Sequence, residues 1–239
     1  DLNFFLLWVA KTRVAPDSSF ICCDAGAGLP FSSEAMGTIV CSNMIQFIYP
    51  KRLLAHEIER VARADALIVL SSVRHSLYKA LTANIAIPPE SYGQLFTRPH
   101  TVVDEEEILQ RYLRGYGPNL KQLDRTKGSL ADSPLIDVVV SGDRTRFQEW
   151  GSFAQWPHAV GRLDINPLYK SAWNGDRLEL RLDWPSNHFR EDNTPMEDYL
   201  PVHAELTEMQ MEDIRNNTIS DAVKPLVDRG VVVDVPVHY

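Results

Sequence analysis

The chain has 239 residues, with 24 lysines and arginines against 32 aspartates and glutamates, a formal net charge of −8 and 44% hydrophobic residues. This composition is typical of a globular protein and excludes collagen-like, coiled-coil and wholly disordered chains. The acidic balance disfavours nucleic-acid and anionic-membrane partners, which bind through clustered lysine and arginine, and it favours a small-molecule partner.

The cysteines Cys22, Cys23 and Cys41 all lie in the first fifth of the chain. This use of cysteine favours a reducing compartment, and we expect a cytoplasmic protein. Neither the cysteines nor the histidines have the spacing of a metal site, so no metal is expected. The apolar run at residues 2–10 is too short to cross a bilayer, and the acidic Asp1 before it disfavours a signal peptide.

The first quarter of the chain begins with a helical pattern followed by two short apolar runs. Apolar residues at helical spacing over 2–14 predict a helix, which Asp1 or Asn3 caps. The runs at 19–23 and 38–42 are apolar without alternation, which is typical of buried strands. The first of them ends at an aspartate and a Gly/Pro-rich loop.

A helix, a strand, a helix and a further strand follow in turn. Apolar residues stripe a predicted helix over 53–61, and the uninterrupted apolar run at 66–71 predicts a strand covered on both faces. Residues 102–113 predict another helix that opens with acidic residues in a solvated first turn, and 135–140 predict a strand. This order predicts an α/β fold, with a Rossmann-like, mostly parallel sheet and helices on both faces.

The last hundred residues have a different character. Alternating apolar and polar residues at 178–184 and 163–165 predict half-exposed strands, and Asn174-Gly175 between them is a strong turn signal. We expect these strands to form an antiparallel ribbon, followed by helices at about 208–216 and 221–228. The chain is therefore expected to contain a core at 1–140 and a C-terminal α+β appendage at 141–239, which shapes an acceptor site or binds a partner.

Ligands of parallel sheets lie at the carboxyl ends of the strands, which directs attention to Asp1, Asp24, Ser42 and Ser72. An ionised carboxylate can accept hydrogen bonds from both hydroxyls of a ribose, and a second acid can accept one from an adenine amine. Asp1 and Asp24 are spaced to supply one acid each. On spacing alone, the alternative that the two acids only cap a helix and a turn is equally good.

Four segments in consistent order resemble the class I S-adenosylmethionine-dependent methyltransferases that act on small molecules. They are Phe20-Ile-Cys-Cys-Asp-Ala-Gly-Ala-Gly-Leu-Pro-Phe31, Thr38-Ile-Val-Cys-Ser-Asn-Met-Ile-Gln-Phe-Ile48, Glu59-Arg-Val-Ala-Arg63 and Leu67-Ile-Val-Leu-Ser-Ser72. The resemblance covers roughly residues 1–115. It implies S-adenosylmethionine as the cofactor, a small-molecule methyl acceptor and a methyltransferase activity.

The resemblance also implies roles for individual residues in holding the adenosine. Asp1 would bind the ribose hydroxyls of S-adenosylmethionine, with Leu2 beside the adenine ring. Asp24 and Ala25 would hold the adenine edge through a side chain and a backbone amide.

The methionine portion falls, on the same resemblance, to residues that follow the run at 38–42. Cys41 and Ser42 would line it, with Met44 and Gln46 facing the cofactor or the acceptor. No residue is assigned to catalysis, because the electrophilic sulfonium carbon of the cofactor needs little beyond proximity and in-line geometry, with a base only for a weak nucleophile.

The sequence departs from the family pattern in three places. The family's first strand and Gly-rich turn would precede Asp1, so the core is expected to be N-terminally incomplete. Met36-Gly37 stands where the family usually has Phe-Asp, and Ala64-Asp65-Ala66 stands where it often has Pro-Gly-Gly. These departures leave open an inactive methyltransferase-like scaffold, or a regulator that senses the cofactor without turnover.

Other patterns carry weaker hypotheses. Gly26-Ala27-Gly28 lacks the third glycine of a dinucleotide fingerprint, which disfavours a dehydrogenase. Aromatic side chains are dense in the appendage and could floor an acceptor pocket, although core packing explains them equally well. They are Trp150, Phe153, Trp156, Tyr169, Trp173 and Trp184. His75, His158 and His188 are candidate general bases, with a structural role as the alternative.

Overall fold

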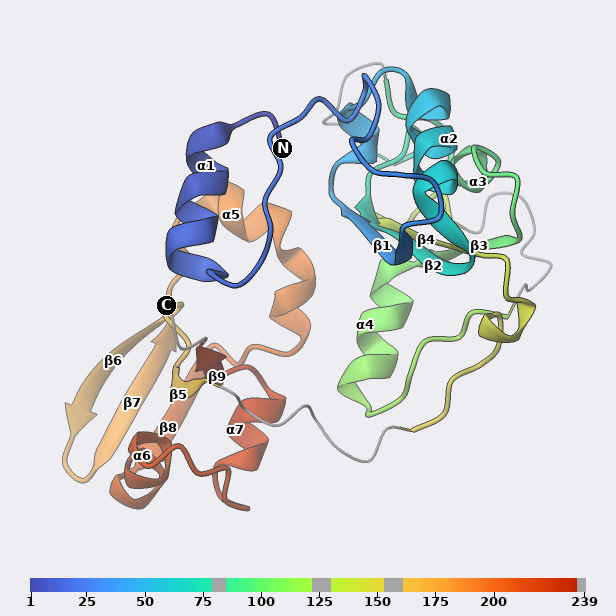
Figure 1. Cartoon of the computed structure of the whole chain (residues 1–239). Helices are drawn as coiled ribbons and strands as arrows, with labels where there is room; N and C mark the ends of the chain where they lie inside the picture. The colour runs from blue at the N-terminus through green and yellow to red at the C-terminus, as the bar shows by residue number, and fades with distance from the viewer. Residues whose placement is uncertain (79–84, 122–129, 153–160, 236–239) are drawn as a thin grey trace. The chain divides into compact units, whose positions relative to one another are not determined.

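The computed structural model describes residues 1–78, 85–121, 130–152 and 161–235. The chain divides into two compact units, one made of Asp1–Trp8 with Ser19–Ala154 and the other of Val9–Ser18 with Gln155–Tyr239. Most of the first unit is a four-stranded sheet with its helices, and most of the second is formed by two small antiparallel sheets (Figure 1).

The sheet of the first unit has the strand order β1-β2-β4-β3. Strands β1 (Met36–Ser42) and β2 (Ala62–Val73) are parallel, and β4 (Ile136–Ser141) runs antiparallel to β2 and to β3 (His100–Asp104). The carboxyl ends of β1, β2 and β3 therefore share one edge of the sheet with the start of β4. The prediction of an α/β fold is confirmed, and the sheet combines one parallel pair with two antiparallel pairs.

Helices cover both faces of this sheet, as predicted. On one face α2 (Lys51–Val61) and α3 (Pro89–Gly93) pack on alternate residues of β2 and β4. On the other face α4 (Glu105–Leu113) packs through Ile108. The buried side chains of the first face are Leu54, Ala55, Ile58, Ile68, Leu70, Tyr92, Phe96, Val138 and Val140, and those of the second face are Val103, Leu120 and Val139. Apolar side chains therefore pack on both faces of the central strands β2 and β4, which explains why their sequences do not alternate between apolar and polar residues.

Two predictions about this unit were wrong. Residues 19–23 form no strand. Their backbone contacts to Asp1 are the Cys23 amide on the Asp1 carbonyl at 3.0 Å and the Asp1 amino group on the Ile21 carbonyl at 3.5 Å, and Ile21 and Cys22 remain exposed. The helix predicted over 102–113 begins only at Glu105, since residues 100–104 pair with β4 as strand β3. Strand pairing there overrides a pattern that is equally compatible with a helix.

The helix predicted over residues 2–14 is present as α1 (Phe4–Val9), which continues into a π-helical turn at Ala10–Val14. Of the two predicted caps, Asn3 fills the role, because its side-chain oxygen accepts a hydrogen bond from the Leu6 amide at 3.2 Å.

Three strands of the second unit form an antiparallel meander, β6 (Tyr169–Asn174), β7 (Arg177–Leu182) and β8 (His203–Thr207). A separate ladder joins β5 (Arg162–Ile165) to β9 (Val232–Val235). Leu178, Leu180 and Leu206 of the meander are buried in one core, while the residues between them are exposed. The predicted alternation of β7 therefore reflects a sheet with one dry face.

The expected partner of β7 was wrong, although the turn was right. The segment 163–165 pairs with β9, and β7 pairs with β6 across a two-residue loop, Gly175-Asp176. Gly175 has φ of 63°, which suits a glycine at the first position of a tight hairpin. Strand β7 pairs with β6, its neighbour along the chain, because closing a two-residue loop costs little chain entropy.

The remaining helices of the second unit are short. They are α5 (Asn187–Asp192), α6 (Glu208–Arg215) and α7 (Lys224–Asp228), with single 3-10 turns at Thr194–Asp198 in this unit and at Ile45–Phe47 and Arg144–Arg146 in the first. The two helices predicted near the C-terminus are confirmed, and the second begins three residues later than expected. Gly230 with φ of 67° follows α7, as a helix C-terminus favours.

Candidate functional site

The carboxyl ends of β1 and β2 meet at the edge where ligands of parallel sheets bind. The Asn43 amide, just after β1, donates a hydrogen bond to the Ser71 carbonyl of β2 at 2.9 Å. Asn43 and Ser72 both have positive φ, 47° and 53°, although neither is a glycine. Left-handed backbone at non-glycine residues is uncommon and concentrates at functional sites, so two such residues on neighbouring strand ends mark this edge.

The two acids of the sequence hypothesis lie beside each other along the backbone. The Cys23 amide donates to the Asp1 carbonyl at 3.0 Å, which brings the residue before Asp24 against Asp1. One oxygen of each carboxylate closes a local turn: Asp1 Oδ1 accepts from the Asn3 amide and Asp24 Oδ1 from the Gly26 amide, both at 2.8 Å. The capping alternative therefore accounts for Oδ1 of each acid.

Oδ2 of each carboxylate accepts no hydrogen bond within the described part of the chain. Asp24 is exposed, and the neighbouring Ala25 is half-buried against the first core with its backbone amide free of any partner among the described residues. Leu2, the predicted neighbour of the adenine, is 70% exposed. Acceptor oxygens and one amide donor are thus available beside an exposed apolar side chain.

Cys41 and Ser42 face in opposite directions at the end of β1. The Cys41 side chain is buried in the first core, where desolvation raises the pKa of its thiol to about 11 despite a hydrogen bond from the Ile45 backbone. It is therefore a neutral core residue at physiological pH. Ser42 is exposed, and the described residues offer no hydrogen-bond partner to its hydroxyl.

Gln46 is fully buried on the 3-10 turn that follows β1. Its Nε2 donates to Asn43 Oδ1 at 2.6 Å, and its Oε1 has no hydrogen-bond partner among the described residues. Below it, buried Lys51 donates to the carbonyls of Ile48 at 2.7 Å and Gln46 at 3.3 Å, and burial lowers the pKa of its amine. A buried amide oxygen without a donor is costly, so Gln46 Oε1 is a place where a ligand donor would be stabilised.

Ser72, which the sequence places at this edge, belongs to a second polar cluster whose two acids were not predicted. Ser72 connects two acids: its amide donates to Asp137 Oδ1 at 3.0 Å and its hydroxyl to Glu105 Oε1 at 2.7 Å. Burial, together with the neighbouring charge of Glu105, raises the pKa of Asp137 to about 7. Burial also raises the pKa of Glu105, whose Oε2 is buried without a partner among the described residues.

The signal for this cluster lay in the strand that carries Asp137. In Ile-Asp-Val-Val-Val-Ser every residue is buried, so the single acid in that apolar run had to face a protein environment. The acidic run 104–107 was predicted to be a solvated helix start. This holds for the exposed Glu106 and is wrong for Glu105, which turns inward, while Asp104 caps α4 by accepting from the Glu106 amide.

Among the candidate histidines, His75 is not available as a general base. His75 is buried with both ring nitrogens engaged, Nε2 on the Ser133 carbonyl at 2.8 Å and Nδ1 accepting from the Leu77 amide at 3.3 Å. This is the structural role that was the alternative. His188 is exposed on α5, and His158 lies outside the described residues.

The aromatic residues considered for an acceptor pocket differ in their burial within the described part of the chain. Tyr169 is buried in the second core, where its hydroxyl donates to the Pro201 carbonyl at 2.8 Å. Trp184 packs against the same core and Phe189, whereas Trp173 and Trp150 are exposed. Phe153 and Trp156 lie outside the described residues. Packing explains the buried members of this set.

Residues 1–78, 85–121, 130–152 and 161–235 contain no group of three or more histidine, cysteine, aspartate or glutamate side chains that could hold a metal ion. In the same ranges, every helix is too short or too polar to cross a bilayer.

The polar groups of Asp1, Asp24 and Ala25, together with those of Ser42 and Gln46 at the end of β1, match the parts of an adenosine joined to an amino acid. The free carboxylate oxygens accept from hydroxyls or an exocyclic amine, and the Ala25 amide can donate to a ring nitrogen. The orphaned Gln46 Oε1 calls for a donor such as an ammonium group. The residues present therefore fit S-adenosylmethionine, with the Cys41 thiol outside the contact set because it lies in the core.

Comparison with known proteins gives partial likenesses. No protein-family model matches the chain. A curated relative, the methylenetetrahydrofolate–tRNA-(uracil-5-)-methyltransferase TrmFO of Anaeromyxobacter dehalogenans (strain 2CP-C), is 30% identical over 116 residues, which is 48% of this chain and 23% of that protein. The chain thus spans about a quarter of that relative.

Solved structures with a similar arrangement include S-adenosylmethionine-dependent methyltransferases. A possible histamine N-methyltransferase from Thermotoga maritima matches with a TM-score of 0.35 and 10% identity, over 52% of this chain and 63% of that one. A methyltransferase from Aquifex aeolicus gives 0.32 and 11% over 59% and 65%, and the [4+2]-cyclase SpnF gives 0.37 and 11% over 58% and 63%. The chain spans less than two thirds of each, and likeness at this level assigns no function.

Proposed function

We propose that this chain contributes the S-adenosylmethionine site of an enzyme that transfers a methyl group to a small-molecule acceptor. The observation that carries the proposal is the fully buried Gln46 Oε1, which lacks a donor among the described residues at the end of β1. A ligand with an ammonium group would supply that donor. The free groups of Asp24, Ala25 and Ser42 support the same assignment.

In this proposal the cofactor lies across the carboxyl ends of the strands. Asp1 takes the ribose hydroxyls, and Asp24 with the Ala25 amide takes the adenine edge beside Leu2. Ser42 and Gln46 hold the methionine portion.

When bound, S-adenosylmethionine supplies a methyl carbon that is already electrophilic. The residues of the chain therefore have to bind and orient it and to keep the acceptor in line with the sulfonium, since proximity and orientation provide much of such a rate enhancement. A base is needed only for a weakly nucleophilic acceptor.

The net charge of −8 favours a small acceptor over a nucleic acid, because tRNA binding depends on lysine and arginine to replace counterions. The name of the curated relative refers to a tRNA uracil as its substrate. A tRNA acceptor is therefore the alternative outcome when acceptors are tested.

A catalytically inactive scaffold is the second candidate function. It is favoured by the engagement of Asp1 Oδ1 and Asp24 Oδ1 in local turns and by the burial of the Cys41 thiol. Such a protein would keep the sheet and lose the affinity for the cofactor.

Isothermal titration of the full-length gene product with S-adenosylhomocysteine separates the two candidates. We expect saturable 1:1 binding, which Asp24→Ala abolishes or severely weakens. Asp65→Ala is the matched control, because Asp65 is an exposed acid of the same unit at the opposite end of β2. Binding that survives in Asp24→Ala contradicts the assignment of the adenine site, and the absence of heat with the wild type favours the scaffold.

A further inference from the structure

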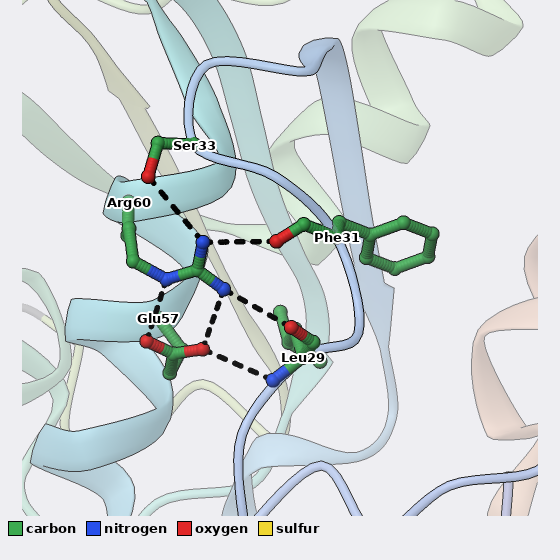
Figure 2. Close-up of polar contacts among 5 residues, drawn as sticks. All are labelled: Leu29, Phe31, Ser33, Glu57 and Arg60. Carbon is green, nitrogen blue, oxygen red and sulfur yellow. Dashed lines mark hydrogen bonds and ion pairs between the residues drawn. The ribbon is translucent and has the colours of Figure 1, made fainter.

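The loop that carries Asp24 and Ala25 is fastened to helix α2 by one arginine. Figure 2 shows the Arg60 guanidinium at the centre of five hydrogen bonds. Two go to the carboxylate of Glu57, one turn earlier on the same helix, both at 2.8 Å. The others reach the carbonyls of Leu29 at 3.0 Å and Phe31 at 2.9 Å and the hydroxyl of Ser33 at 3.4 Å.

Glu57 completes the attachment from the other side. Its Oε2 accepts from the Leu29 amide at 3.0 Å, so both backbone groups of Leu29 are held by the Glu57–Arg60 pair. The Arg60 carbonyl in turn accepts from the Glu34 amide at 2.9 Å. The backbone groups of a loop need hydrogen-bond partners, which a neighbouring strand provides within a sheet. Here one ion pair provides the hydrogen bonds.

The attachment lies five residues from Asp24, and the chain between them is tightly turned. The Asp24 carboxylate and carbonyl accept from the amides of Gly26 and Ala27, at 2.8 Å and 3.1 Å. Gly28 has φ of 121°, a backbone conformation that other residues rarely adopt. Leu29 then packs against the first core. Fixing Leu29 therefore limits the positions that Asp24 can take.

The pair stays charged throughout the physiological range. The hydrogen bonds from Arg60 and from the Leu29 amide hold the pKa of Glu57 at about 2, well below its ordinary value. The same contact raises the pKa of Arg60. The attachment is therefore constant above the ordinary pKa of a glutamate.

We propose that Glu57 and Arg60 are positioning residues that hold the loop Asp24–Ser33 in the conformation that receives the adenosine of the cofactor. This inference rests on the proposed function. Neither residue touches the cofactor in this account. Their contribution to affinity passes through Asp24 and Ala25, because a loop held in its binding conformation loses less conformational freedom when the ligand arrives.

The test combines ligand affinity with a readout that needs no ligand. Arg60→Ala and Arg60→Lys are titrated with S-adenosylhomocysteine, and amide hydrogen exchange of the loop is followed in the free proteins. Arg52→Ala is the matched control, because Arg52 is an exposed arginine on the same helix with no partner among the described residues. Arg60→Lys keeps the charge and loses the planar fork, so it guards against a general folding defect of the alanine variant.

We expect Arg60→Ala to weaken binding about tenfold or more and to speed amide exchange at Leu29 by a similar factor, with Arg60→Lys in between. Arg52→Ala should change neither quantity. In a double-mutant cycle with Asp24→Asn, the combined loss should be smaller than the product of the single losses, because both substitutions act through one contact.

Three results overturn the inference, and they are distinguishable. Unchanged affinity in Arg60→Ala, or losses that multiply fully in the cycle, shows that the pair does not act through Asp24. Unchanged exchange at Leu29 shows that it does not hold the loop. Failure of the wild type to bind S-adenosylhomocysteine removes the proposed function and the cofactor role of the pair together, while the exchange experiment still reports whether the pair holds the loop.

Discussion

Two polar clusters in the first unit hold carboxylates in place, and they differ in charge balance. The Glu57–Arg60 pair joins an anion to a cation, and its contacts lower the pKa of Glu57 to about 2. The cluster at Ser72 joins two acids, and burial beside a like charge raises the pKa of Asp137 to about 7. The first cluster is therefore insensitive to pH near neutrality, whereas the second must gain or lose a proton there.

The direction of this pH dependence follows from linkage. Asp137 binds its proton more tightly in the folded chain than in the unfolded chain, where the ordinary value is 3.8. Its contribution to stability is thus greatest below about pH 4, falls as the pH rises to about 7 and is then constant. For Glu57 the sign is reversed: its stabilising contacts are complete above pH 4.5 and are lost as the pH falls toward 2.

The largest expected effect is that of Asp137→Asn. Asparagine keeps an acceptor for the Ser72 amide and removes the buried charge, so the variant should be more stable than the wild type at pH 8, by at most about 4 kcal/mol. The advantage should vanish at pH 4, where Asp137 is protonated. Urea unfolding of both proteins between pH 4 and pH 8 measures it, and a constant difference across that range would break the contrast between the clusters.

A smaller effect is expected for Ser72→Ala, which removes the hydroxyl donated to Glu105. Glu105 would then be half-buried without its hydrogen bond from Ser72, which should lower the free energy of unfolding by about 1–3 kcal/mol. Ser72→Gly loses the same bond and relieves the positive φ, so it should cost less. Ser71→Ala, one residue earlier, is the control for urea unfolding at pH 6. Equal stability of Ser72→Ala and Ser71→Ala would show that the serine does not bridge the acids.

The parts of the fold that were predictable are those in which one local pattern dominates. Strands β2 and β4 were identified because helices on both faces leave uninterrupted apolar runs. Strand β1 was identified from the same kind of run, but it lies at the edge of the sheet and is not a buried strand, with Val40 64% exposed. Strand β3 was missed because its residues fit a helix equally well, and only pairing with β4 decides between them. The partner of β7 was also missed, because a local sequence pattern does not indicate which strand will pair with which.

The candidate site divides in the same way. The contact between Asp1 and Cys23 agrees with the expectation that the two acids lie close together, although the strand at 19–23 on which that expectation rested is absent. Ser42, predicted to follow a strand, is the exposed last residue of β1. The burial of the Cys41 thiol depends on which way β1 faces, which the sequence does not settle. The Ser72 cluster could not be assembled from sequence, because its acids lie 33 and 65 residues further along the chain.

The most direct test of the central claim is amide hydrogen exchange of the full-length gene product with and without S-adenosylhomocysteine, resolved to short peptides. We predict that the ligand protects residues 24–31 and 41–46 and leaves the hairpin at 169–182 unchanged. Protection confined to other segments, with 24–31 and 41–46 exchanging at the same rate in both samples, would contradict the account.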